Sequence, residues 1–476
     1  MKTLKRSNAL RALAAAVLVT VASGCDDGLT DFNRNPNAPD VASAEHLFAN
    51  ATVSSVTRVF GSGLHMDIAA LWVQHYAEHL YTIEDNYVIS DGTISTHWSN
   101  FYTGPLNDFQ MVIDKGQEEG RPNVAAIGSI MQQWTYHVMT DIWGDIGYSN
   151  ALKGRDADAG SQPTFDPQKE VYEGILSTLA SAAASLDPGS PSMFNGDLIY
   201  DGDVEMWRKF ANSLRLRVAM RLSQVDEAWA RTEFADALAD GVFESNADNA
   251  KLTYVDDEVN VHPLYAYQRG RDDHTISATM VDTLKSFSDP RLPIYATPAE
   301  ATGEYVGMPN GVSDDPELTV ISRIGTHFTK ADASAVVMSY AEVLFLQAEA
   351  AERGWISGDP AALYAEAITA AMEELGIDQE DIDAYLAQPA VAYNGLESIA
   401  FQKWIALFGN GVEAWAEWRR TGVPTLEPGP DAQNDGLIPV RLPYPDSERH
   451  RNGANLQAAI DRQGGASLND PLWWDR

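Results

Sequence analysis

Three residues in the stretch HYAEH have the types and spacing of a zinc-binding motif. His75, Glu78 and His79 spell H-x-x-E-H, and on a helix two histidines four residues apart face the same way. A catalytic zinc site also needs a third protein ligand and an open position. None of the downstream glutamates sits in a recognisable motif, and the chain has no phosphate-binding loop or G-x-S-x-G elbow. The sequence therefore favours ordinary polar histidines beside a packed helix, and it predicts no catalytic residue, metal site or cofactor.

A mixture of aromatic and polar side chains follows this motif. It comprises Tyr81, Asp85, Asn86, Tyr87 and Trp98. Sugar rings have apolar C–H faces that flat aromatic side chains can cover, while amide and carboxylate groups bind the hydroxyls. We therefore predict that these residues line an exposed, shallow ligand site, with Arg271 and Asp272 of the central loops as polar partners. For Trp98, packing inside the scaffold is the alternative.

Cys25 is the only cysteine of the chain, and its surroundings predict a lipid anchor. Basic residues precede an apolar run over residues 12–22, which is shorter than a membrane span and typical of a signal-peptide core. Small residues then lead directly to the thiol, as in a bacterial lipobox. We expect residues 1–24 to be a signal peptide and Cys25 to be lipidated, with residues 25–40 as a polar tether. A free cysteine in an ordinary signal peptide is the alternative.

The charge of the chain excludes one class of partner. The formal charge is −35, and removing residues 1–24 removes four basic residues and no acidic one, which takes it to −39. A polyanion of this size repels nucleic acid. DNA and RNA binding are therefore not expected.

Helical periodicity dominates the rest of the sequence. Apolar residues recur every three to five positions in the segments 68–81, 164–186, 206–223 and 338–376. The last segment reads as two helices joined by a Gly-Asp-Pro turn, the second of them rich in alanine, a pattern found in tetratricopeptide-like hairpins. We predict a mostly α fold of helical pairs forming a curved scaffold. Residues 246–335 are broken by Gly, Pro and Asp, and we expect a long, loop-rich, ligand-facing region there.

Several phrases in a fixed order carry a resemblance to a known family. They are QQWTYHVMTDIWGDIGYSNAL, WRKFANSLRLRVAMRLS, FQKWIALFGNGVEAWAEWRRTGVPTL and RLPYPDSERHRN. With the lipobox and tether, the chain resembles the SusD/RagB-like outer-membrane nutrient-binding lipoproteins, in the branch named for starch-binding proteins that associate with the outer membrane. The resemblance implies one SusD-like helical domain over residues 41–476, with an irregular insertion at about 246–335.

The resemblance also implies a function without covalent chemistry. It implies a cell-surface lipoprotein that is anchored to the outer membrane and lies over a TonB-dependent, SusC-like barrel. Its task is to capture an oligosaccharide or a peptide and deliver it to that transporter. Two other classes stay open: a zinc-dependent hydrolase that uses His75, Glu78 and His79, and a structural or adhesive surface lipoprotein.

The phrase AWAEWRRTG allows two interpretations. Glu413, Arg419 and Arg420 could clamp a ligand, or they could form a buried arginine–carboxylate pair that locks two helices together. We favour the buried pair, because the phrase belongs to the part of the sequence that resembles the family scaffold.

Overall fold

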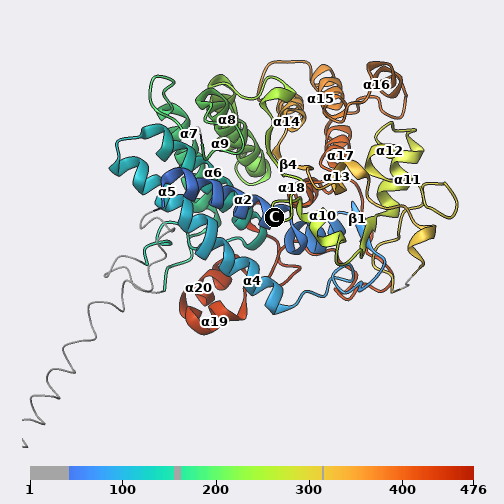
Figure 1. Ribbon diagram of the computed structural model, residues 1–476, viewed down its shortest axis with the longest axis horizontal. Helices are drawn as coiled ribbons and strands as arrows, with labels where there is room; N and C mark the ends of the chain where they lie inside the picture. Colours follow the sequence, from blue (N-terminus) through green and yellow to red (C-terminus); the bar gives the residue numbers. More distant parts are fainter. Residues whose placement is uncertain (1–41, 155–161, 194, 314–315, 476) are drawn as a thin grey trace, which may run out of the picture. The chain divides into compact units, whose positions relative to one another are not determined.

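The fold is described from a computed structural model that covers residues 42–154, 162–193, 195–313 and 316–475. The helices and strands below belong to one unit, Ala44–Arg476, and most of it is helical (Figure 1). This confirms the predicted mostly α fold. Cys25, the predicted signal peptide and the predicted tether lie outside the described residues. No helix within the described ranges combines the length and the apolarity that a membrane span requires.

Most helices of the first half pack against the next helix in the chain. They are α2 (Ala44–Phe60), α4 (Asp91–Phe101), α5 (Asn107–Glu118), α6 (Pro122–Trp143), α7 (Gln168–Ser185), α8 (Val204–Arg221) and α9 (Glu227–Ala239). The apolar stripe predicted for α7 is buried at Val171, Ile175 and Leu179. Asp203 caps α8, because its carboxylate accepts hydrogen bonds from the backbone N–H groups of the first turn. The sequence therefore predicts α7 and α8 correctly.

A second group of helices follows the irregular region. It comprises α14 (Tyr340–Glu352), α15 (Pro360–Glu374), α16 (Gln379–Leu386), α17 (Leu396–Ala406) and α18 (Gly411–Thr421). The helices α14 and α15 form the predicted hairpin, in which Asp359 caps α15 and Pro360 occupies its first position. Small residues such as Ala367 and Ala371 are buried between the helices, which lets them approach closely.

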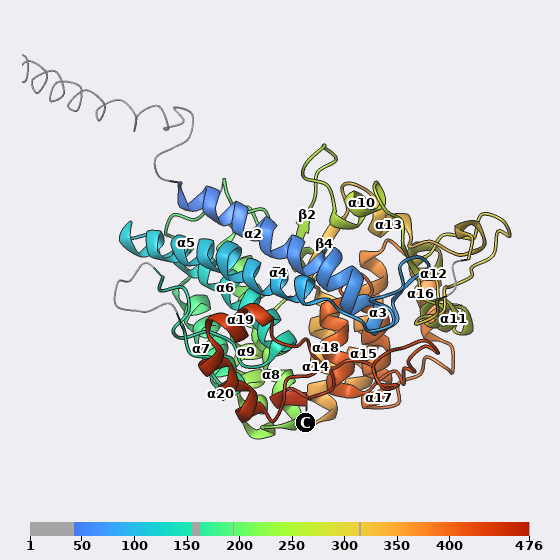
Figure 2. The same cartoon turned by 90° about the horizontal axis from the view of Figure 1, so that it is seen from below.

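The irregular region contains short elements separated by loops, as predicted. They are β2 (Ala250–Thr253), α10 (Pro263–Gln268), β3 (His274–Ile276), α11 (Ala278–Ser286), α12 (Leu292–Tyr295), α13 (Thr326–Thr329) and β4 (Ser334–Met338). The strand β2 pairs with β4, and β3 pairs with the distant β1 (Tyr76–Glu78), both antiparallel. Figures 1 and 2 show α11 and α12 at the end of the unit opposite α5 and α7, and Figure 1 shows α10 and β1 between that end and the middle of the unit. The short α19 (Asp446–Arg451) and α20 (Gly453–Gln463) follow near the C-terminus.

The helix predicted over residues 68–81 is wrong beyond Trp72. The π-helix η1 (Ser62–Ala69) continues into α3 (Ala70–Trp72), and the backbone then turns at Gln74, whose φ is +56°. The strand β1 follows, and its three residues are all buried. Periodicity cannot distinguish a strand buried on both faces from a buried helix. The distant partner β3 therefore decides the structure of this segment.

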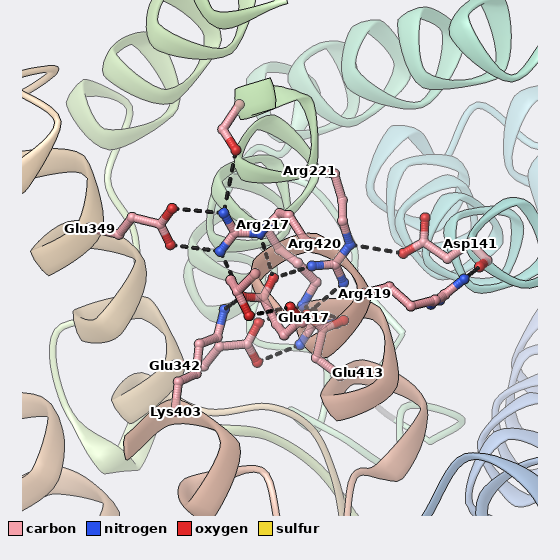
Figure 3. A network of polar contacts seen from close by, with 12 residues as sticks. Asp141, Arg217, Arg221, Glu342, Glu349, Lys403, Glu413, Glu417, Arg419 and Arg420 are labelled. Atoms are coloured by element: carbon pink, nitrogen blue, oxygen red, sulfur yellow. Dashed lines mark hydrogen bonds and ion pairs between the residues drawn. The ribbon is translucent and has the colours of Figure 1, made fainter. Parts of the chain in front are cut away.

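Buried arginines and carboxylates connect α8 to three other helices (Figure 3). The Arg221 guanidinium on α8 contacts Asp141 of α6 at 3.1 Å and Glu413 of α18 at 2.6 Å, and it also pairs with Glu417. On the same helix, Arg217 forms two hydrogen bonds of 2.6 Å with Glu342 of α14. Two parallel hydrogen bonds between a guanidinium and a carboxylate fix both the distance and the relative orientation of the two side chains.

The phrase AWAEWRRTG contributes α18 to this network, which confirms the predicted buried pair. Arg420 binds both oxygens of Glu349 at 2.6 and 2.7 Å and also contacts Glu417 at 2.8 Å. Burial by itself raises the pKa of Glu417, but Arg420, Lys403 and Arg221 outweigh it and hold this pKa well below its usual range. The network therefore holds the scaffold together and leaves these charges unavailable to a ligand.

Candidate ligand-binding surface

Pairing of β1 with β3 brings two sequence-predicted segments together. Glu78 lies opposite His274 in the ladder, so the loop after β1 meets the loop before β3. The backbone N–H of His79 donates to the Asp273 carbonyl at 3.0 Å, and the His79 ring donates from Nε2 to the Asp272 carbonyl at 2.8 Å. These bonds fix the position of Tyr81, which follows β1, relative to Arg271, which precedes β3.

Tyr81 is an exposed ring held beside a guanidinium group. Its side chain is 64% exposed, and the Arg271 guanidinium carbon lies 4.6 Å from its ring centroid and 5.7 Å from that of Tyr267. These distances are within the range of cation–π attraction. The φ of Tyr81 is +56°, a left-handed conformation that is uncommon for a bulky residue and that occurs at ligand-contacting positions.

Polar groups surround this ring. Arg271 pairs with Asp273, and Arg323 pairs with Asp272, while the two arginine side chains remain 53% and 47% exposed. We call Tyr81, Tyr267, Arg271, Asp272 and Arg323 the Tyr81 surface. It offers an aromatic face, donors and an acceptor within one patch. No motif in the sequence pointed to Tyr267 or Arg323. Both lie in the predicted loop-rich region, where aromatic and charged residues are frequent.

The prediction of an exposed site is wrong for the other residues after β1. Asp85, Asn86 and Tyr87 are buried. The Asp85 carboxylate accepts from the Asn310 side chain at 2.9 Å and from the Glu78 N–H at 3.3 Å, and its burial raises its pKa to about 6. The Tyr87 ring packs edge-on against Trp72 at 6.3 Å. These side chains shape the loop that presents Tyr81, because the backbone turns them inward.

Trp98 is also an interior residue, as the alternative interpretation had it. Only 3% of it is exposed. Its ring stacks on Phe165 at 5.8 Å and meets Trp143 edge-on at 5.3 Å, while its N–H donates to Glu448 at 3.1 Å. With both ring faces and the N–H occupied, Trp98 packs in the scaffold, and the expectation that it faces a ligand is wrong.

The H-x-x-E-H residues do not have the helical arrangement that the alternative zinc site requires. Because β1 separates His75 from His79, the two rings do not share a helix face. The His75 ring donates from Nε2 to the Trp404 carbonyl at 3.0 Å, and the His79 ring is bonded to the Asp272 carbonyl. Burial lowers the pKa of His75 to about 3. Among the described residues, the group of side chains close enough to hold a metal ion contains Glu78 but neither His75 nor His79.

A separate cavity of about 280 Å³ opens among the described residues near the start of β4. Its lining includes Tyr295, Phe328 and Phe408. The rings of Tyr295 and Phe408 stack on each other at 4.3 Å, and Phe328 packs edge-on against Phe408 at 5.0 Å. Since these rings contact one another, they offer a ligand less open face than Tyr81 does.

Comparisons with known proteins agree on one family. The family model described as starch-binding and associating with the outer membrane, a SusD-like family, matches residues 36–445. A search of curated proteins found no match.

Solved structures support this assignment. A protein titled as chitin-binding is 29% identical, with a TM-score of 0.83, and the match covers 91% of this chain and 100% of the other. A chitin-binding SusD homologue from Flavobacterium johnsoniae is 26% identical, with a TM-score of 0.79 and coverage of 90% and 98%. A SusD homologue from Bacteroides ovatus is also 26% identical, with a TM-score of 0.79 and coverage of 91% and 99%. The chain therefore belongs to the SusD-like family of starch-binding proteins that associate with the outer membrane.

Proposed function

We propose that this protein is an outer-membrane lipoprotein that binds an oligosaccharide at the Tyr81 surface and delivers it to a SusC-like, TonB-dependent barrel. The observation that carries the proposal is the exposed Tyr81 ring held beside Arg271. A sugar ring can stack on Tyr81, while the exposed arginines donate hydrogen bonds to its hydroxyl or amide oxygens and Asp272 accepts from its O–H groups. Lipidation at Cys25 anchors the chain to the membrane.

Chitin fragments are the first ligands to test. Two of the similar structures are titled as chitin-binding, and N-acetylglucosamine units carry carbonyl groups that suit arginine donors. Maltooligosaccharides form the second arm, because the family is named for starch. Peptides form the third arm, since an exposed aromatic ring flanked by arginine donors also suits a peptide.

The experiment is calorimetric titration of the wild-type protein and of Tyr81→Ala with oligosaccharides of each class. Loss of one stacking ring removes about 0.5–1.5 kcal/mol, so the dissociation constant should rise roughly 2- to 13-fold. Tyr393→Ala is the matched control, because Tyr393 lies outside the Tyr81 surface and pairs with Glu352. A folded Tyr81→Ala protein that keeps the wild-type affinity would place the ligand elsewhere, with the 280 Å³ cavity as the next candidate.

Delivery to a transporter has its own test. Affinity purification from native membranes should recover a TonB-dependent barrel with the protein. Recovery of the intact lipoprotein without a barrel, combined with no glycan or peptide binding, would favour the structural or adhesive alternative. The hydrolase alternative loses the motif that suggested it, because β1 lies between His75 and His79 and the two rings do not share a helix face.

A further inference from the structure

Three side chains with metal-binding chemistry converge next to the Tyr81 surface. Asp67 comes from η1, Glu78 from β1 and His274 from β3, and each offers one ligand atom within 4.8 Å of the others. His274 Nε2 lies 3.1 Å from Asp67 Oδ1 and 3.6 Å from Glu78 Oε1. Tyr267 connects this cluster to the Tyr81 surface, because its ring packs edge-on against His274 at 5.2 Å.

The His274 imidazole is buried and lacks a hydrogen bond. Only 1% of it is exposed, and neither Nε2 nor Nδ1 has a hydrogen-bond partner. Asp67 Oδ1 also has none, whereas Glu78 Oε2 accepts from the Asp85 N–H at 3.2 Å. Since buried polar atoms without a partner are costly, Nε2 facing two carboxylate oxygens points to a ligand that binds all three atoms.

The spacing of these atoms suits a small divalent cation. Zinc binds imidazole nitrogen and carboxylate oxygen at about 2.0–2.2 Å in a tetrahedron, which places neighbouring ligand atoms about 3.3 Å apart. The observed separations of 3.1 and 3.6 Å bracket this value. One imidazole with two carboxylates also matches the ligands of transition metals better than the all-oxygen sites of calcium.

The surroundings favour a cation and give it access. Glu84 and Asp85 add negative charge close to Glu78, and the Asp67 side chain is 23% exposed. A metal ion would enter along the exposed side of Asp67, because Asp67 Oδ1 and His274 Nε2 are themselves buried. Its protein ligands would come from three separate elements, so binding would tie η1 to the β1–β3 ladder.

We propose that Asp67, Glu78 and His274 form a binding site for a divalent transition-metal ion, with Zn²⁺ as the probe. This proposal is independent of the oligosaccharide function. It differs from the H-x-x-E-H hypothesis, because only Glu78 is shared and the histidine ligand comes from β3.

The test measures zinc directly in the tag-free full chain. Wild-type protein, stripped with a chelator and titrated with ZnCl₂, should bind about one ion per chain. A hundredfold excess over the dissociation constant should raise Tm by about 3 °C for a domain of this size. Asp67→Asn and His274→Gln should each weaken zinc binding at least about 10-fold. His450→Gln, at an exposed histidine outside the cluster, should bind as the wild type does.

Asp67→Asn keeps the shape of a partly exposed side chain, so it decides the question even if His274→Gln does not fold. Circular dichroism confirms the fold of each variant. Absence of stoichiometric zinc in the wild type overturns the proposal and leaves His274 as a buried contact of Asp67 and Glu78. Undiminished zinc binding in folded Asp67→Asn, or tight binding of Ca²⁺ in preference to Zn²⁺, also overturns it.

Discussion

Replacing Arg221 by methionine tests how much the buried charge network stabilises the scaffold. Arg221 is fully buried, and its guanidinium pairs with Asp141, Glu413 and Glu417. Methionine keeps most of the apolar stem but removes the charge. The three carboxylates of α6 and α18 then lose the cation they share.

The size of the effect follows from the remaining partners. Removing one member of a buried ion pair costs about 3–5 kcal/mol, because a charge is left uncompensated. Glu417 still contacts Arg420 and Lys403, so we expect the lower end, about 3 kcal/mol. The unit Ala44–Arg476 should unfold with an entropy of about 0.9 kcal/mol/K, which converts this loss into a Tm lowered by about 3 °C.

Scanning calorimetry of Arg221→Met and of Lys330→Met provides the comparison. Lys330 pairs with Asp332 at 3.5 Å, and both side chains are 55% exposed. An exposed pair contributes about 0–1 kcal/mol, so Lys330→Met should shift Tm by at most about 1 °C. Equal Tm values for wild type and Arg221→Met would refute the view that this network holds α8 to α6 and α18.

Three further outcomes are expected. Cys25→Ala should move the protein from the membrane to the soluble fraction. The intact mass of the native protein should show a lipidated chain that begins at Cys25, and an unmodified chain that begins at Met1 would contradict the anchor. Trp98→Ala should cost about 3–5 kcal/mol of stability, as large aromatic truncations in cores do, and leave the oligosaccharide affinity of the folded protein unchanged. Tyr81→Ala should weaken oligosaccharide binding and leave the stability unchanged. Thermal unfolding and titration on the same samples separate the two effects. Acid should unfold the protein as its partnered carboxylates are protonated. The pKa of Asp141 is lowered because His137 and Arg221 outweigh burial, and the pKa of Glu417 is lowered by its neighbouring cations. These two carboxylates therefore stabilise the fold fully above the unfolded pKa of about 4, and their contribution declines as pH falls below it. A Tm that is flat between pH 6 and pH 3 would contradict this.

The scaffold could be predicted because its signals are local. A helix such as α7 shows its buried face as a stripe within a few turns of sequence, and caps such as Asp203 mark where helices begin. The role of Arg420 could also be predicted, since the phrase around it resembles a family scaffold. Each of these conclusions depends on residues that are close together in the chain.

The candidate site could be predicted only in part, because it depends on distant pairing. The sequence indicated Tyr81, Arg271 and Asp272, and the structure places them together. It could not show that Trp98 faces inward, because an aromatic residue suits a core and a binding surface equally well.

By itself, the amino-acid sequence determined the helical composition of this protein, its family resemblance and the predicted anchor at Cys25. Only the tertiary structure decided that residues 76–78 form a strand, since pairing with β3 outweighs their local pattern. The same pairing placed Glu78 opposite His274 and Tyr81 beside Arg271. Hydrogen bonds between strands far apart in the chain satisfy backbone groups that no local pattern specifies. The positions of the functional side chains therefore follow from the fold as a whole.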